Sequence, residues 1–152
     1  DLACHASRGR TKRTELLYHD AGHLYIYLNY GIFYMTNVVC GKINSPEAVL
    51  LRSVEIIEGI EIAKKRINRN KYVKLNHSFA TGPGKLSIAL DFNKNQNGLD
   101  IITSNEIYIE KPDNHRRPPI VKTSRIGVYY AKHCKNYPWR FYIKDNPFVS
   151  KK

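Results

Sequence analysis

Cysteine is scarce in this sequence, and no two cysteines form a C-x-x-C pair. The residues are Cys4, Cys40 and Cys134. An odd number without paired spacing argues against structural disulfides and favours a reducing, cytosolic compartment. Cys4 and Cys134 each adjoin a histidine, but adjacent residues lack the spacing of ordinary zinc ligands. We therefore expect no metal and no other cofactor.

Long hydrophobic runs are also missing. No stretch of about 18 apolar residues is present, so we expect no membrane-spanning helix. No secretory leader is visible. The first residue is Asp1 rather than an initiator methionine, and we expect an upstream segment to have been removed or left out. The 152 residues, of which 42% are hydrophobic, suffice for one domain with a real core.

Acidic residues are few: 13 Asp and Glu stand against 25 Lys and Arg, which gives a net charge of +12. Four basic groups stand out, and they are Arg8, Arg10, Lys12 and Arg13; Lys64, Lys65, Arg66, Arg69, Lys71 and Lys74; Arg116, Arg117, Lys122 and Arg125; and Lys132, Lys135, Arg140 and Lys144. Neutralisation of phosphates is the common reason for such a surplus. The alternatives are an anionic membrane surface and charge that merely keeps the protein soluble. The charge favours a nucleic acid as the partner.

Residues 24–37 are the most informative segment. Apolar and aromatic residues flank the triplet Asn29-Tyr30-Gly31, which predicts two strands joined by a short turn. Tyr30 would then project from the tip, and Tyr27 would share a strand face with Tyr25. An ordinary core hairpin is the alternative, because strands favour tyrosine. In so basic a protein, the pattern indicates a wedge into stacked bases beside a surface that receives a base.

The rest of the chain predicts one α+β domain, mostly antiparallel. A buried strand that carries one arginine is expected over residues 48–55. Residues 59–70 alternate as a helix, with Ile60, Ile62, Ala63 and Ile67 facing inward. A second helix is expected to begin near Pro83, which suits a first-turn position. Further strands are expected at residues 107–109, 125–130 and 139–143, and a Pro-rich basic loop at residues 111–119.

Several single residues have both a structural and a functional interpretation. A buried Arg52 would need a carboxylate such as Glu55 or Glu58, or it would orient a catalytic carboxylate and its water. Asn37 would either satisfy backbone groups or face a pocket and read a base edge. His5 would stack on a base or lie on the surface. Residues 82–86 fail the phosphate-loop pattern, but a helix that starts there can hold a phosphate on its free amides.

Six ordered segments together resemble the alkyladenine (3-methyladenine) DNA glycosylase family of bacteria and vertebrates. They are residues 5–9, 25–37, 49–52, 82–86, 125–128 and 140–142, and the likeness extends over most of the chain from His5 to Ser150. Residues 66–77 and 111–124 are the least alike. The resemblance implies a single domain around a curved, mostly antiparallel sheet with flanking helices.

The resemblance also implies an activity: excision of alkylated or deaminated purines from double-stranded DNA by metal-free, monofunctional hydrolysis. Residues 1–152 would form the glycosylase domain. Tyr30 matches the intercalating tyrosine, and Tyr27 and His5 match residues that stack on and flank the flipped base. Asn37 matches an amide that disfavours guanine. Arg52 matches an arginine that positions the attacking water. Lys85 matches a possible phosphate contact. The protein would act as a monomer, in the bacterial cytoplasm or in a eukaryotic nucleus.

The sequence departs from the family's pattern at its beginning. The family's catalytic glutamate, and a third pocket tyrosine after it, precede the segment that matches Asp1 to His5. We expect the glutamate to lie upstream of Asp1, and Asp1 is not its equivalent. A non-catalytic module that grips damaged DNA or RNA with the same hairpin remains the alternative. A lyase-type glycosylase would need an activated lysine, and the sequence marks out none.

Overall fold

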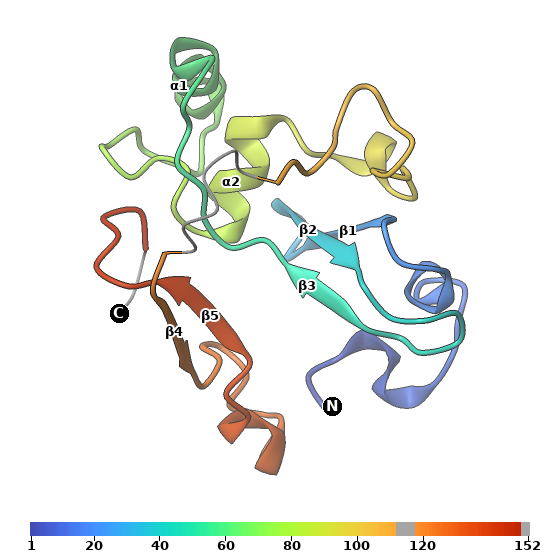
Figure 1. The fold of residues 1–152 in the computed structure, drawn as a ribbon. Helices are drawn as coiled ribbons and strands as arrows, with labels where there is room; N and C mark the ends of the chain where they lie inside the picture. The colour runs from blue at the N-terminus through green and yellow to red at the C-terminus, as the bar shows by residue number, and fades with distance from the viewer. Residues whose placement is uncertain (112–117, 150–152) are drawn as a thin grey trace.

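The computed structural model, which describes residues 1–111 and 118–149, is built around the tyrosine hairpin (Figure 1). Strands β1 (Leu24–Asn29) and β2 (Phe33–Val39) are antiparallel, with Tyr27 opposite Met35 and Tyr25 opposite Asn37. The short strand β3 (Ala48–Leu50) pairs with the end of β2, so the order is β1-β2-β3. The predicted hairpin is therefore confirmed.

The two faces of this sheet pack against different parts of the chain. Leu24 and Ile26 point to one face and form a core with Leu86 of helix α2 (Pro83–Leu90). The opposite face carries Tyr25 and Val39, which the N-terminal segment covers with its 3-10 turns η1 (His5–Arg8) and η2 (Glu15–Tyr18). This alternation follows from the period of two along a strand. The end of the face nearest the turn stays open.

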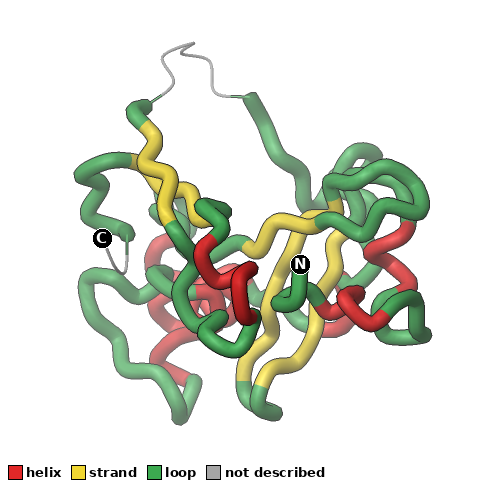
Figure 2. The backbone as a smooth tube through the Cα atoms, turned by 90° about the horizontal axis from the view of Figure 1, so that it is seen from below, coloured by secondary structure: helices red, strands yellow, loops and turns green. Residues whose placement is uncertain are grey.

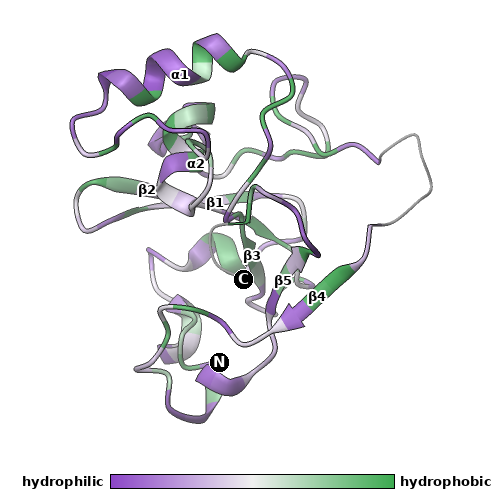
Figure 3. Cartoon of the chain, turned by 90° about the vertical axis from the view of Figure 1, so that its left-hand side faces the viewer, coloured by the Kyte–Doolittle hydropathy of each residue, from purple (hydrophilic) through white to green (hydrophobic). Residues whose placement is uncertain are grey.

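Helix α2 is the central element of the helical layer. It contacts β2 on one side and helix α1 (Ile60–Arg69) on the other, and a 3-10 turn, η3 (Lys94–Gln96), follows it (Figure 1). Leu86 and Ala89 are fully buried, as expected for a helix that is apolar around most of its surface. Helix α1 lies at the outer edge and is polar along most of its length (Figure 3). Both predicted helices are confirmed.

Helix α1 buries a narrower face than its sequence predicted. Ala63 and Ile67 are buried, whereas Ile60 and Ile62 are 39% and 58% exposed. Only a narrow side of α1 packs on α2, through Ala63 and Ile67, whereas Ile60 lines a cavity next to it. The prediction that all four residues face inward is therefore wrong for Ile60 and Ile62.

The expected buried strand at residues 48–55 is wrong in length and in burial. After Leu51, whose amide still donates to Thr36 of β2, the chain runs beside the segment before α2, where the Gly82 amide donates to the Arg52 carbonyl at 2.9 Å. Ser53 forms an isolated bridge with Thr81 in the same stretch. Val49 is 55% exposed, so even the true strand is an edge strand. The change of partner places Arg52 beside the open face of the sheet instead of in the core.

A second, two-stranded antiparallel sheet lies apart from the first (Figure 2). It pairs β4 (Ile120–Thr123) with β5 (Arg140–Ile143), and the 3-10 turn η4 (Lys132–Asn136) lies between them in the chain. The predicted strand at residues 139–143 is confirmed. The prediction for residues 125–130 is wrong, because Gly127 has a φ of 81° and the chain turns there.

Residues 107–109 form no strand either. The Ser104 hydroxyl accepts hydrogen bonds from the Glu106 and Ile107 amides, which makes a local turn, and Ile109 is 68% exposed. Most of the expected loop at residues 111–119 lies outside the described residues. The structure confirms a single α+β domain with antiparallel strands and flanking helices, divided into two sheets.

Leu86 of α2 is fully buried in the core that it forms with Leu24 and Ile26 of β1. Leu86→Ala is expected to lower the free energy of unfolding by about 2–5 kcal/mol, because it removes buried methyl groups and leaves a cavity. The matched control is Leu90→Ala, four residues along the same helix and 39% exposed, which should cost much less. Equal losses in urea-unfolding experiments would contradict this account of the core.

Candidate nucleic-acid interface

Tyr30 projects from the tip of the β1–β2 hairpin, as predicted. Tyr30 and Gly31 have φ values of 50° and 67°, and the Ile32 amide donates to the Asn29 carbonyl at 3.0 Å. Two positive φ values at the centre of such a turn define type I′, the form that matches strand twist. A positive φ is uncommon for a tyrosine, and Tyr30 is 88% exposed. A strained, solvent-facing aromatic ring of this kind gains nothing from the core and points to a role in binding.

His5 and Tyr27 are brought together on the open face of the sheet. Their ring centroids are 4.4 Å apart at an interplanar angle of 67°. The Tyr25 ring lies 5.6 Å from that of Tyr27, and its hydroxyl group hydrogen-bonds to His5 Nδ1 at 2.8 Å. The three rings therefore form one aromatic cluster, which we call the tyrosine–histidine cluster. Flat apolar rings with polar edges are suited to hold a heterocyclic base.

Tyr25 is a site residue whose role the sequence did not reveal. Its side chain is buried and fixes the orientation of His5, while its backbone carbonyl accepts a hydrogen bond from Asn37 Nδ2 at 3.0 Å. One residue thus positions two others. The only signal in the sequence was its alternation with Tyr27, which indicated a shared face but no hydrogen bond.

Asn37 satisfies backbone carbonyl groups at the edge of the cluster. Its Nδ2 donates to the carbonyls of Tyr25 and Met35, at 3.0 and 3.3 Å. Its side chain is almost fully buried. Two acceptors hold the amide in one orientation, so it is a rigid group beside Tyr25 and Met35.

Arg52 is half-buried, and of its two interpretations the structure does not form the ion pair with Glu55 or Glu58. Within the described part of the chain no carboxylate lies within 4.0 Å of it, and its Nη2 donates instead to the Ile126 carbonyl at 3.4 Å. Burial and the nearby guanidinium groups of Arg140 and Arg125 lower the pKa of Arg52 from its ordinary value. Such crowding of like charges costs free energy unless an anion offsets it.

Arg13 is a second residue that the sequence did not single out, although it belongs to the first basic group. Its guanidinium lies over the Tyr27 ring, 5.6 Å from the centroid. Burial and the Arg13 charge both lower the pKa of His5 from 6.5. Burial raises the pKa of Tyr27, and the Tyr25 and Tyr130 hydroxyl groups add to the rise. Both rings are therefore neutral near pH 7.

Lys85 belongs to the first turn of α2 and lines an open cleft of about 520 Å³ that also includes Tyr30. The expected phosphate contact thus lies next to the expected wedge. None of His5, Tyr27, Asn37 and Arg52 lines this cleft. The cleft nevertheless adjoins the tyrosine–histidine cluster, because Met35 lines the cleft and pairs with Tyr27 across the hairpin.

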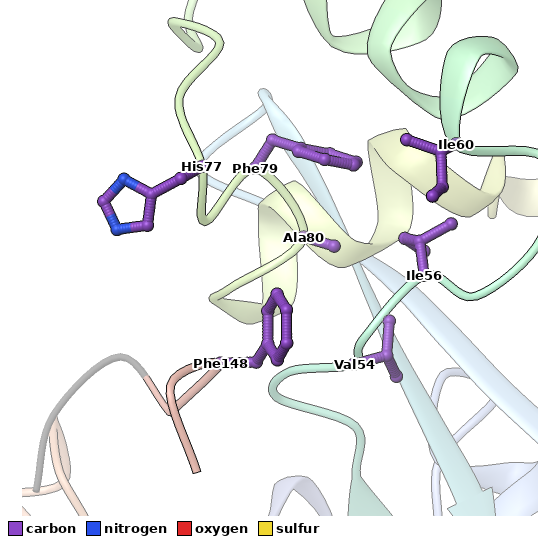
Figure 4. A pocket seen from close by; sticks show the side chains of 7 residues that line it. All are labelled: Val54, Ile56, Ile60, His77, Phe79, Ala80 and Phe148. Atoms are coloured by element: carbon purple, nitrogen blue, oxygen red, sulfur yellow. The ribbon is translucent and has the colours of Figure 1, made fainter.

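Another cavity, of about 190 Å³, lies below α1 and contains none of the predicted site residues. Ile56, Ile60, Phe79 and Phe148 contribute apolar side chains to it, and His77 points away from the rest (Figure 4). The Ser53 hydroxyl donates to the Phe148 carbonyl and ties the C-terminal segment to this region. We interpret this cavity as a packing gap.

Other kinds of site are not formed by the residues described. No cluster of three His, Cys, Asp or Glu residues suited to a metal ion occurs in residues 1–111 and 118–149. The same residues include no helix with the length and apolar character needed to cross a membrane. The three cysteines are free thiols, with Cys40 exposed, Cys4 half-buried and Cys134 buried.

The model of one protein family, described as methylpurine-DNA glycosylase, matches residues 1–147. The chain belongs to the methylpurine-DNA glycosylase family. A protein of Clostridium perfringens (strain SM101 / Type A), named for 3-methyladenine DNA glycosylase activity, is 42% identical over all of this chain and 77% of its own length. Relatives of the same name in Natranaerobius thermophilus and Methanocella arvoryzae are each 42% identical, over 75% and 74% of their lengths.

Membership of the methylpurine-DNA glycosylase family confirms the resemblance inferred from the sequence. It makes the protein a DNA glycosylase of DNA repair, with DNA as its substrate. The surplus of positive charge then has a partner, because DNA phosphates are the anions that the basic groups would meet. The roles of the individual site residues remain predictions.

The lowered pKa of His5 predicts a pH effect on stability. The unfolded chain takes up a proton near pH 6.5, whereas the folded chain does so only at lower pH. The free energy of unfolding should therefore fall as the pH drops from 6.5 through the pKa of folded His5. His5→Gln, which cannot titrate, should lose less stability between pH 7 and pH 5 in urea-unfolding experiments. Equal pH slopes in the two proteins would contradict the assignment.

Proposed function

We propose that this DNA glycosylase flips alkylated or deaminated purines out of double-stranded DNA and hydrolyses their N-glycosyl bonds. The substrates would include 3-methyladenine, hypoxanthine and ethenoadenine. One observation carries the proposal: the exposed Tyr30 ends the same hairpin whose open face holds the tyrosine–histidine cluster. A wedge and a base-binding surface on one rigid element are what base flipping requires.

Tyr30 would perform the first step by occupying the space that the flipped nucleotide leaves. Extrusion of a base costs a few kcal/mol, and least where damage has weakened pairing or stacking. The Tyr30 ring recovers part of that cost by stacking on the neighbouring bases. Because the type I′ turn already holds this ring in solvent, little ordering is needed on binding.

Tyr27 and His5 would receive the flipped base. A 3-methylated adenine is cationic, and the electron-rich face of Tyr27 attracts it. Neutral hypoxanthine gains less from this contact and would need hydrogen bonds, for which the His5 ring offers Nε2, because its Nδ1 is already bound to the Tyr25 hydroxyl group. Asn37, held by two carbonyls, would act as a rigid group that leaves no room for the exocyclic amine of guanine.

Water attack at C1′ gives the sugar oxocarbenium character, as in other glycoside hydrolyses. Arg52 would position that water. The general base would be a glutamate that no residue of 1–152 matches, and we place it upstream of Asp1. Asp1 does not suit the role, because both of its oxygens bind Arg125, at 2.5 and 2.9 Å. No step requires a metal or a cofactor.

We also propose an oligomeric state and a cellular compartment for the enzyme. Residues 1–152 would act as the glycosylase domain of a monomer that meets DNA in the bacterial cytoplasm or in a eukaryotic nucleus. A lyase mechanism stays a weaker variant, and borohydride trapping of a covalent DNA adduct would reveal it. The second candidate function is non-catalytic binding of distorted duplex through the same hairpin, and the exposure of Tyr30 favours it equally.

Single-turnover release of hypoxanthine, measured together with binding, separates the two functions. Residues 1–152 should bind a hypoxanthine duplex without releasing the base, because loss of a general base costs roughly 10²–10⁴-fold in rate. Fusion to the segment that precedes the match in the Clostridium perfringens relative should restore release. Release by residues 1–152 alone would assign the base to a carboxylate within them. A fusion that binds but never releases would favour the non-catalytic function.

The wedge is tested by Tyr30→Ala. The lost stacking, worth about 1–3 kcal/mol per base, should weaken binding to a lesion duplex by roughly one to two orders of magnitude in a fluorescence-anisotropy titration. Tyr30→Phe keeps the ring and should bind almost normally. Ile57→Ala, which changes a side chain of 81% exposure away from the hairpin, is the control for general surface effects. Unchanged binding by Tyr30→Ala would rule out the wedge.

A further inference from the structure

Arg125 connects the beginning of the chain with the stretch between β4 and β5. Its Nη1 and Nη2 donate to the two carboxylate oxygens of Asp1, at 2.5 and 2.9 Å, and Nη2 also donates to the Cys134 carbonyl at 2.9 Å. The guanidinium lies 5.3 Å from the centre of the Trp139 ring. Only 14% of each of the two charged side chains is exposed. Two-pronged pairs are the strong form of ion pair between arginine and a carboxylate, and they fix the geometry of both partners.

The Asp1 side of this pair leads directly to His5. The Asp1 carbonyl accepts a hydrogen bond from the Cys4 amide at 3.0 Å, which closes residues 1–4 into a turn. His5 follows as the first residue of η1 and belongs to the tyrosine–histidine cluster. A group that holds Asp1 therefore also sets where the His5 segment begins.

The Arg125 side of the pair leads to a loop that borders the same cluster. Next in the chain, the Ile126 carbonyl accepts a hydrogen bond from Arg52 Nη2 at 3.4 Å. Burial raises the pKa of Tyr27, and the Tyr130 hydroxyl group adds to that rise, so this hydroxyl group lies near Tyr27. Arg125 begins the loop and also binds the carbonyl beyond it, so one side chain holds both ends.

We propose that Arg125 is a positioning residue for base recognition, because it fixes residues 1–5 and the loop of residues 126–131 at the tyrosine–histidine cluster. It would act through His5 and Arg52 and would not touch the flipped base itself. The inference rests on the proposed function, since it assumes that this cluster receives the base. Without the ion pair the two segments would be free to move apart, and the cluster would be complete in only a fraction of the molecules.

Two simpler roles fit the surroundings of Arg125 less well. A phosphate contact would need free donors at the surface, but this side chain is mostly buried and both of its terminal nitrogens are bound. A merely stabilising pair would be better placed elsewhere, because burial and the charges of Arg140 and Arg125 lower the pKa of Arg52. Buried ion pairs also add little net stability in many proteins. A charge kept in so crowded a place is better explained by the geometry that it enforces.

Lesion preference tests this role in the protein of residues 1–152. It is the ratio of the dissociation constants for undamaged duplex and for the same duplex with hypoxanthine, both from anisotropy titrations. Arg125→Gln and Asp1→Asn should each lower the ratio several-fold, because the apparent affinity for the flipped base falls with the fraction of molecules in which the cluster is complete. Partial unfolding would weaken both complexes equally and leave the ratio unchanged.

Asp1→Asn gives the sharper result. It removes a negative charge, so it should strengthen binding to undamaged duplex through the phosphates while the lesion preference falls. Neither a loss of folded protein nor a lost phosphate contact produces these two opposite changes. The double variant Asp1→Asn/Arg125→Gln leaves no unpaired charge in this ion pair, so it tests the role even if a single variant fails to fold. It should show the same low preference.

Arg10→Gln is the matched control, since Arg10 forms a two-pronged pair with Glu15, at 2.6 and 2.9 Å, in an exposed place. It should keep the lesion preference of the unaltered protein. A double-mutant cycle then identifies the path, because Arg125→Gln should be non-additive with His5→Gln and additive with Tyr30→Ala. Additivity with His5→Gln, or an unchanged preference in Arg125→Gln and Asp1→Asn, would overturn the inference.

Failure of this inference is distinct from failure of the proposed function. If the unaltered protein binds hypoxanthine duplex no better than undamaged duplex, the proposed function fails, and this inference fails with it. If the unaltered protein shows the preference and both single variants retain it, only the role of Arg125 is refuted.

Discussion

The antiparallel pairing of β1 with β2 determines both which side chains enter the core and which remain at the surface. Its register sends Leu24 and Ile26 into the core with α2 and leaves Tyr25 and Tyr27 on the other face. The same register ends in a type I′ turn that exposes Tyr30. A slip by one residue would exchange the two faces, burying the tyrosines and exposing the core. The core packing and the surface proposed to bind the base are therefore set by one choice of pairing.

Positive charges lie close together beside the tyrosine–histidine cluster. Arg13 lies over Tyr27, while Arg52 is close enough to Arg140 and Arg125 for their charges to lower its pKa. Asp1 offsets Arg125 through a two-pronged ion pair, but Arg52 has no such partner among residues 1–111 and 118–149. The free protein thus holds like charges together beside an aromatic surface. DNA phosphates would relieve that repulsion, and this relief would contribute to the free energy of DNA binding.

Local patterns predicted the hairpin, both helices and the position of Tyr30, because strand alternation, turn chemistry and a first-turn proline are properties of short segments. The features that were missed depend on contacts between segments that are far apart in the sequence. Arg52 was expected to be buried, but after Leu51 the chain changes its pairing partner from β2 to the segment before α2. The Tyr25–His5 hydrogen bond joins residues 20 positions apart. Neither feature leaves a periodic signal. The family resemblance indicated His5 and Arg52 as site residues but gave no contacts for them.

In the proposed function, the tyrosine hairpin unstacks a damaged purine and holds it against the tyrosine–histidine cluster. The most direct measurement is the fluorescence of a single ethenoadenine in a duplex, followed by stopped flow after mixing with the protein. Stacked ethenoadenine is quenched, so flipping should first raise its emission, and contact with Tyr27 and His5 should then change it in a second phase. Binding seen by anisotropy with no change in ethenoadenine emission would mean that the base stays stacked, and it would contradict the account.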